Sequence, residues 1–182
     1  MKTVALFGGS FDPPHTGHEA IVEALVALKY IDEVVITPTF LNPFKSQSFA
    51  PSNLRLKWLR KIFSSVIKVT VDDYEVNLGK KVPTIKTVKY LLDSFDKVFV
   101  VIGADNVQDI HQWHKYNELK ELVTFIVALR GDETIDKRYI TLPIDENISS
   151  TQLRKKINTE KLPSKCANEI AQFYKEYNAR QN

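Results

Sequence analysis

The 182-residue sequence is poor in the features that mark several classes of protein. Cys166 is its one cysteine, which excludes a disulfide scaffold. No run of about 18 apolar residues occurs, so no membrane-spanning helix is expected. The apolar stretch at the N-terminus is too short for a signal peptide, and the reducing cytoplasm is therefore the expected compartment. No internal repeat or Gly/Ser linker divides the chain, so residues 1–182 are expected to form one domain.

The sequence also lacks a strong excess of either charge. Its 25 basic and 22 acidic residues leave a net charge of +3. That balance is too mild to indicate a nucleic-acid-binding protein. The excess is local, since residues 151–182 hold seven basic and three acidic side chains. A solvated helix face is the ordinary interpretation of such a tail, and attraction of an anionic ligand near residues 151–156 is the alternative. Hydrophobic residues make up 43%, which excludes disorder as the main state.

Apolar runs of strand length alternate with stretches of helical periodicity. The predicted strands cover residues 2–7, 33–37, 67–71, 97–102, 124–129 and 138–142. The main predicted helices cover residues 16–28, 52–63, 84–94, 117–122, 150–157 and 163–177, with Ser52 as the cap of the second. This order predicts an α/β fold, a Rossmann-like doubly wound and mainly parallel sheet with helices on both faces. Residues 38–51 show no period and are expected to form a functional or mobile loop.

In such sheets ligands bind beyond the carboxyl ends of the strands, and the first strand is followed there by GGSFDPPHTGH, residues 8–18. Its glycines let the backbone turn sharply and approach a ligand closely. Thr16 and Glu19 have capping-box spacing, which predicts a helix start near Thr16. His15 and His18 then lie at a helix N-terminus, where free N–H groups and imidazoles favour phosphate. A metal site and a structural role are the alternatives, and the metal is disfavoured because no third ligand is evident.

A second segment, VFVVIGADNVQDIHQWHKYNELK, spans residues 98–120. Gly103 ends a predicted strand and allows close approach of a ligand, and Asp105 can accept a hydrogen bond from a ribose hydroxyl. Trp113 can fold back to stack on a base or a pyridine ring. The alternatives are that Trp113 fills the core and that Asp105 caps a short helix.

A third segment, ISSTQLRKK, spans residues 148–156. Ser149 and Gln152 have capping-box spacing, which again predicts a helix N-terminus. Ser150, Thr151 and the free N–H groups offer donors to phosphate, and Arg154 can make a bidentate contact. An ordinary capped basic helix is the alternative.

The segment GGSFDPPHTGH resembles the signature of the HxGH nucleotidyltransferase superfamily, and the three segments in this order resemble the bacterial nicotinate-nucleotide adenylyltransferase family. The resemblance implies transfer of AMP from ATP to nicotinate mononucleotide, giving deamido-NAD and pyrophosphate, with Mg²⁺ carried by ATP and no metal site in the protein. It implies catalytic roles for His15, His18 and Arg154. The implied ATP-binding residues are Gly8, Gly9, Ser10, Phe11, His15, His18, Gly103, Asp105, Ile148, Ser149, Ser150, Thr151 and Arg154. The implied substrate-binding residues are Lys45, Thr84, Ile85, Trp113 and His114.

Two loops match that family less closely. Asn42-Pro43-Phe44-Lys45 resembles its Pro-x-Lys loop, in which Lys45 would reach phosphate; a solvent-exposed lysine is the alternative. Asp73-Tyr74-Glu75 resembles its D-x-E segment, which is followed in the family by a loop that carries Ser-Tyr-Thr. Here that loop reads Val82-Pro83-Thr84-Ile85, so that Thr84 and Thr87 match but the Ser and the Tyr do not. Pro83 also removes one N–H donor.

This departure leaves the acceptor open, with nicotinamide mononucleotide or phosphopantetheine as alternatives. A nucleotide sensor without turnover is a more remote hypothesis. Neither a nucleic acid nor a membrane is expected as a partner, and the sequence leaves the oligomeric state open.

Overall fold

A computed structural model describes residues 1–130 and 135–180, and these form a six-stranded sheet in the order β3-β2-β1-β4-β5-β6. Every neighbouring pair is parallel. The strands are β1 (Thr3–Gly9), β2 (Glu33–Pro38), β3 (Val69–Val71), β4 (Lys97–Gly103), β5 (Val123–Arg130) and β6 (Ile140–Ile144). The chain moves outward from β1 to β3 and then returns to β4, so the strand order reverses between β1 and β4. The predicted α/β fold is confirmed.

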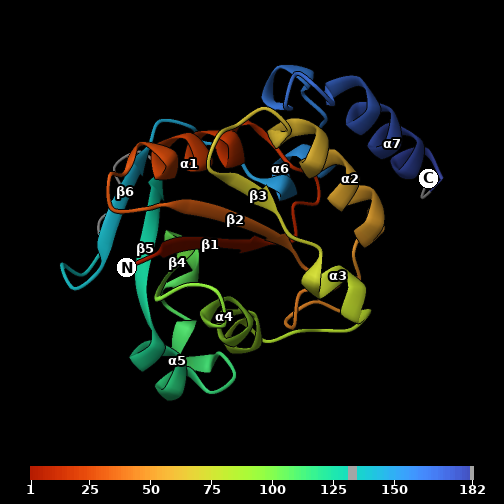
Figure 1. Cartoon of the computed structure of the whole chain (residues 1–182). Helices are drawn as coiled ribbons and strands as arrows, with labels where there is room; N and C mark the ends of the chain where they lie inside the picture. The colour runs from red at the N-terminus through yellow and green to blue at the C-terminus, as the bar shows by residue number, and fades with distance from the viewer. Residues whose placement is uncertain (131–134, 181–182) are drawn as a thin grey trace.

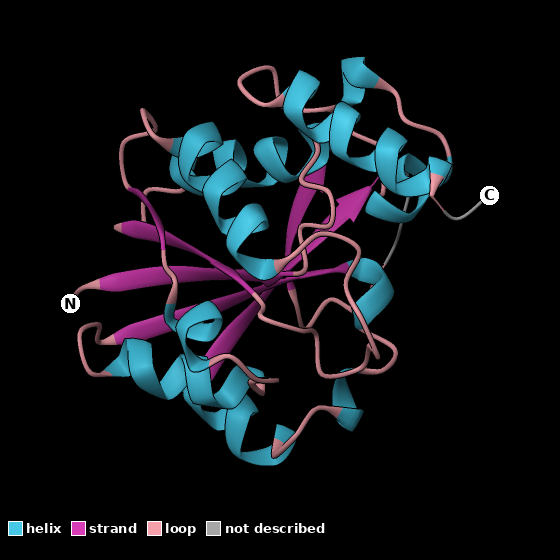
Figure 2. Cartoon of the chain, turned by 90° about the vertical axis from the view of Figure 1, so that its right-hand side faces the viewer, coloured by secondary structure: helices cyan, strands magenta, loops and turns pink. Residues whose placement is uncertain are grey.

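Helices cover both faces of this sheet (Figures 1 and 2). One side carries α1 (Thr16–Ala27), α2 (Ser52–Phe63), α6 (Ser150–Lys155) and α7 (Ala167–Ala179), and the other carries α4 (Thr84–Leu92) and α5 (Tyr116–Leu122). Short elements complete the described chain: α3 (Tyr74–Leu78) and the 3₁₀ turns η1 (Ala104–Asn106), η2 (Ile110–Gln112) and η3 (Thr159–Lys161).

The alternation of side chains along the strands builds a separate core on each face. In β1, Ala5 and Phe7 belong to the core beneath α1, α2 and α7, whereas Val4 and Leu6 belong to the core beneath α4 and α5. Because both faces are covered, the middle residues of the central strands form nearly continuous apolar runs, as expected for a parallel sheet.

Several local predictions need correction. The Thr16–Glu19 capping box is wrong: His15 is the N-cap of α1, and its backbone N–H donates to Nδ1 of His18 at 3.1 Å. Ser52 is the first residue of α2 rather than its cap, which is Pro51. No pattern predicted α3, whose five residues are too few to show a period.

The last helix begins at Ala167 instead of residue 163, because Pro163 to Cys166 form a turn that is closed by a hydrogen bond from Cys166 N–H to the carbonyl of Pro163. The third and sixth strands begin two residues later than predicted.

Candidate functional site

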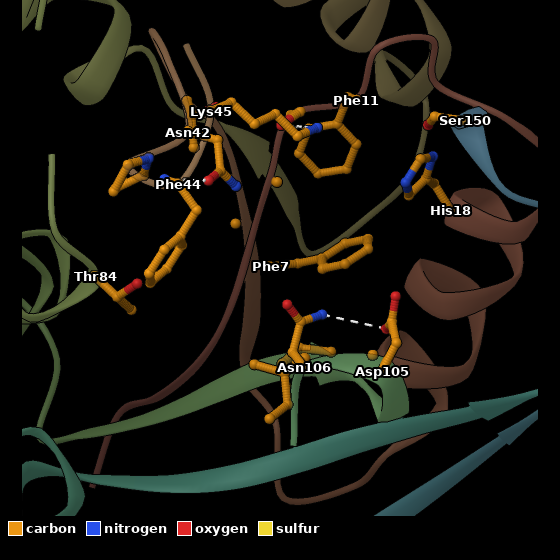
Figure 3. Close-up of a pocket in the computed structure, with 18 of the residues that line it drawn as sticks. Phe7, Phe11, His18, Asn42, Phe44, Lys45, Thr84, Asp105, Asn106 and Ser150 are labelled. Atoms are coloured by element: carbon orange, nitrogen blue, oxygen red, sulfur yellow. Dashed lines mark hydrogen bonds between the residues drawn. The ribbon is translucent and has the colours of Figure 1, made fainter. Parts of the chain in front are cut away.

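One pocket of about 370 Å³ opens at the carboxyl ends of β1 and β4, where the strand order reverses. This is the position at which doubly wound sheets bind ligands. It gathers residues from all three predicted segments and from both loops (Figure 3). The predicted site residues that line it are Gly8, Gly9, Ser10, Phe11, His15, His18, Lys45, Thr84, Gly103, Asp105, Trp113, His114, Ser149, Ser150, Thr151 and Arg154.

Two predicted site residues do not line the pocket. The side chain of Ile85 is buried in the core beneath α4, so only its backbone can face a ligand. Ile148 packs against the opposite core, and a Cβ added to Gly17 would lie 3.1 Å from its Cγ2 atom. Gly17 therefore lets α1 approach the chain just before α6.

His15 and His18 form a stacked pair at the start of α1, with ring centroids 3.7 Å apart. Burial lowers the pKa of His15 to about 3, and the nearby charge of Arg130 acts in the same direction. Burial, followed by His15 and Arg130, holds the pKa of His18 well below its usual value. Both rings are therefore neutral at pH 7. Since Nδ1 of His18 accepts the N–H of His15, the proton of that ring lies on Nε2, which remains a donor to a ligand.

The first loop and α6 are held together by direct hydrogen bonds. Ser150 Oγ donates to the carbonyl of Pro13 at 2.8 Å, and Arg154 donates to the carbonyl of Asp12. Arg154 also donates to Thr151 Oγ1 at 2.9 Å. These contacts fix the guanidinium in the lining of the pocket.

The capping box predicted at the start of α6 is confirmed. Ser149 Oγ accepts the N–H of Gln152 at 3.2 Å, and the side chain of Gln152 accepts the N–H of Ser149 at 2.9 Å. The box satisfies one backbone donor in the first turn and leaves others available to an anion.

Asp12 is a buried carboxylate in the first loop, with 2% of its surface exposed, and it connects this loop to the chain before α2 and to α7. It accepts the N–H groups of Phe49 and Ala50 at 2.8 and 3.0 Å and the hydroxyl of Tyr174. Burial and the charge of Asp12 raise the pKa of Tyr174, which therefore stays a donor. Asp12 orients the two loops and has little capacity left for a metal.

Arg55, which no sequence pattern predicted, holds the same two loops from α2. It is 1% exposed and donates to four backbone carbonyls. These belong to Ala50 (3.0 Å), Ser10 (2.6 Å), Thr39 (2.8 Å) and Phe40 (3.0 Å). The only sign of this role in the sequence was an arginine on the predicted apolar face of the helix, one turn before Leu59.

Lys45 lines the pocket from the loop after β2 while part of it stays exposed, and its contact with phosphate remains a prediction. Its ammonium group donates to Ser10 Oγ at 3.3 Å. Burial lowers its pKa, and the nearby positive charge of Arg154 adds to the effect. Two cations held close together in this way form a favourable place for a polyanion.

Asp105 presents its carboxylate at the end of β4, next to Asn106 (Figure 3). A Cβ at Gly103 would lie 2.6 Å from Asp105 Oδ1, so the glycine is needed for the carboxylate to turn back over the strand end. Trp113 and His114 line the same cavity from the turn before α5.

Glu75 is a buried acid in the pocket lining, and the family resemblance assigned no role to it. Thr87 Oγ1 donates to its Oε1 at 2.6 Å, while Oε2 has no hydrogen-bond partner among the described residues. Burial raises the pKa of Glu75 to about 7, and Asp72 adds to the rise. Close by, α4 begins at Thr84 after Pro83 without a side-chain cap, which leaves backbone donors free.

Within the described ranges, no group of three or more His, Cys, Asp or Glu residues is placed to hold a metal ion. Among the same residues, no helix combines the length and the apolarity needed to cross a bilayer.

Comparison with known proteins gives one consistent result. Residues 6–156 match the cytidylyltransferase-like family. Two relatives carry the name "Probable nicotinate-nucleotide adenylyltransferase". The protein of Sulfurimonas denitrificans is 60% identical over 176 residues, which cover 97% of both chains. That of Nitratiruptor is 45% identical over 94% of this chain and 98% of its own.

Among solved structures, the Plasmodium falciparum nicotinic acid mononucleotide adenylyltransferase complexed with NaAD superposes with a TM-score of 0.78. It is 23% identical and covers all of this chain, with 98% of its own chain matched. A likeness at that identity supports the fold.

Proposed function

The chain belongs to the nicotinate-nucleotide adenylyltransferases of the cytidylyltransferase-like family, and from this we propose that it transfers AMP from ATP to nicotinate mononucleotide. The products are deamido-NAD and pyrophosphate, a step of NAD biosynthesis. The observation that carries the proposal is the convergence of three separate motif segments on one pocket, two of them suited to phosphate and one to ribose and an aromatic ring, in a chain with a 60% identical relative of that name.

The chemistry asks the protein for positioning and charge stabilisation. A phosphate oxygen of nicotinate mononucleotide attacks the α-phosphorus of ATP, the bond from that phosphorus to the bridging oxygen breaks, and pyrophosphate leaves. The attacking phosphate is already an anion, so no side-chain nucleophile is needed. The pocket accordingly presents donors and cations.

We assign the phosphate end of the pocket to His15, His18 and Arg154. The neutral imidazole of His18 donates from Nε2 to an oxygen of the α-phosphate, a role that its buried and fixed ring supports. Arg154, Lys45 and the N–H groups at the start of α6 hold the β- and γ-phosphates. Mg²⁺ enters on ATP and neutralises its phosphates; Asp12, whose oxygens are engaged, is not assigned to it.

We assign the ribose and acceptor contacts to residues from the other strands. Asp105 accepts from a ribose hydroxyl, and Trp113 stacks on the pyridine ring. The free N–H groups at Thr84 and Ile85 and the backbone at His114 bind the pyridine carboxylate. We also propose that the whole chain acts as one nucleotidyltransferase domain, because α7 supplies Tyr174 to the buried carboxylate of the first loop.

Incubation with Mg-ATP and nicotinate mononucleotide tests the function. Pyrophosphate release and deamido-NAD, identified by chromatography, should both appear and should both require the acceptor. Binding of ATP without pyrophosphate release, whichever acceptor is added, would instead support a nucleotide sensor.

The second candidate keeps the chemistry and takes nicotinamide mononucleotide as acceptor. It is favoured by one observation, the replacement of the expected Ser-Tyr-Thr by Val82-Pro83-Thr84, which removes a backbone donor near the carboxylate position.

A further inference from the structure

Phe44 is an exposed aromatic side chain inside the pocket, with 66% of its surface accessible. Among the described residues, the other exposed large apolar side chains lie outside the pocket lining. A ligand that covers this ring would gain stabilisation, because each buried Å² of apolar surface contributes roughly 25 cal/mol.

A tight turn fixes the backbone from which this ring projects. Asn42 accepts the N–H of Lys45 through its carbonyl at 2.9 Å and the N–H of Phe44 through its side chain at 2.9 Å. Pro43 at the second position stiffens the turn, and its carbonyl accepts a hydrogen bond from Lys81 at 3.2 Å. Phe44 is therefore held by the turn backbone although its ring is uncovered.

The turn sends two adjacent side chains to different parts of the pocket (Figure 3). Lys45 extends toward Ser10 of the first loop, which belongs to the phosphate end. In Figure 3 the ring of Phe44 lies on the side of the pocket that carries Thr84, away from His18 and Ser150, and the hydrogen bond from Lys81 to the carbonyl of Pro43 ties the two loops together. Thr84 begins α4 with its backbone donors uncapped, so this end suits an anionic group attached to a flat ring.

We propose that Phe44 is an acceptor-binding residue that packs its ring against the pyridinium ring of the acceptor mononucleotide, in addition to Trp113. The inference rests on the proposed function, which supplies the pyridine nucleotide. The ring of that nucleotide is alkylated on nitrogen and carries a positive charge. A cationic ring over an aromatic face gains both stacking and cation–π attraction. Adenine is the other flat ring of the reaction. We assign the pyridine ring to Phe44 because the acceptor carboxylate is assigned to the start of α4, on the same side of the pocket as Phe44.

Steady-state kinetics of Phe44→Ala test the proposal. We expect KM for nicotinate mononucleotide to rise about 5- to 20-fold, in line with the cost of removing one stacking partner. KM for ATP and kcat should stay within about twofold, and Phe44→Tyr should restore the wild-type KM. Ile67→Ala, which removes an 83% exposed side chain outside the pocket, serves as the matched control and should change nothing.

A binding measurement gives a second readout that needs no turnover. In Phe44→Trp, nicotinate mononucleotide should quench tryptophan emission more strongly than it does in the wild type, whose two tryptophans are Trp58 and Trp113. Ribose 5-phosphate, which lacks the ring, should produce no such quenching.

The outcomes separate the two proposals. Normal KM for nicotinate mononucleotide in Phe44→Ala, or an equal rise in KM for ATP, would overturn the role of Phe44 while the wild-type activity stands. Wild-type enzyme that releases no pyrophosphate with nicotinate mononucleotide would overturn the proposed function, and quenching of Phe44→Trp by the same compound would then still report the ring contact.

Discussion

At the residue scale, the histidine pair shows how burial sets the protonation state of two candidate catalytic groups. Two stacked imidazoles with lowered pKa values are neutral donors, and the hydrogen bond from His15 N–H to His18 Nδ1 decides which nitrogen of His18 carries the proton. The sequence predicted their closeness to phosphate and left their charge open. It could not show the neutral form, since that depends on how deeply the fold buries the rings.

His18→Ala should therefore reduce kcat/KM about 100- to 1000-fold, the usual cost of one lost donor to a developing charge. Pyrophosphate release measures the effect, with the thermal unfolding curve as a check that the variant is folded. His111→Ala is the matched control, because His111 is exposed and lies outside the pocket lining. Near wild-type turnover in His18→Ala would remove this residue from the mechanism.

Glu75 predicts a dependence of stability on pH. Its pKa is about 7 in the folded state against an ordinary 4.5, so the folded chain binds more protons than the unfolded chain between those pH values. The free energy of unfolding must therefore fall as pH rises from about 4.5 to 7, by about 3 kcal/mol from this group.

Chemical unfolding of the wild type and of Glu75→Gln at pH 5 and pH 8 isolates that contribution, because glutamine does not titrate. The wild type should lose stability relative to the variant at pH 8. An equal response of both proteins to pH would contradict the assignment of a buried, protonated acid.

At the scale of the elements, α2 positions the loop between β2 and α2. Arg55 of this helix donates hydrogen bonds to four loop carbonyls. Arg60 of the same helix makes an exposed ion pair with Asp73. Arg55→Met should lower the free energy of unfolding by about 3–5 kcal/mol, since it leaves buried carbonyls without donors. Arg60→Met, the matched control, should cost less than about 1 kcal/mol. Denaturant titration compares the two, and similar losses would refute the role of Arg55.

Most helices and all six strands could be predicted from period and composition, because the apolar runs of a parallel sheet are long and clear. The exceptions have physical causes. Helix α3 is too short to show a period, and a histidine took the capping place that Thr16 was expected to hold. The location of the motif residues at one pocket could be predicted from their chemistry and from the strand order, and their roles remain predictions. The burial of Arg55, Glu75 and Tyr174 could not be predicted, because only the tertiary fold creates it.

At the scale of the whole molecule, the sheet brings residues from the first ten positions and from beyond position 150 to one place. Sequence spacing alone could order these segments along the chain without showing that they meet. Because β1 and β4 are neighbours in the sheet, the segments that follow them meet at its carboxyl edge. Helix α7 contributes Tyr174, whose hydroxyl donates to Asp12 of the first loop. The acceptor end is the part that sequence determines least, because the residues around Pro83 depart from the family's pattern.

The most direct test compares acceptors in parallel. Pyrophosphate release from Mg-ATP should be measured with nicotinate mononucleotide, nicotinamide mononucleotide and phosphopantetheine, and the products separated by chromatography. We predict the highest kcat/KM for nicotinate mononucleotide by at least about tenfold, with deamido-NAD as the product, because the uncapped start of α4 offers backbone donors to a carboxylate. A higher kcat/KM for nicotinamide mononucleotide or phosphopantetheine would contradict the assigned acceptor.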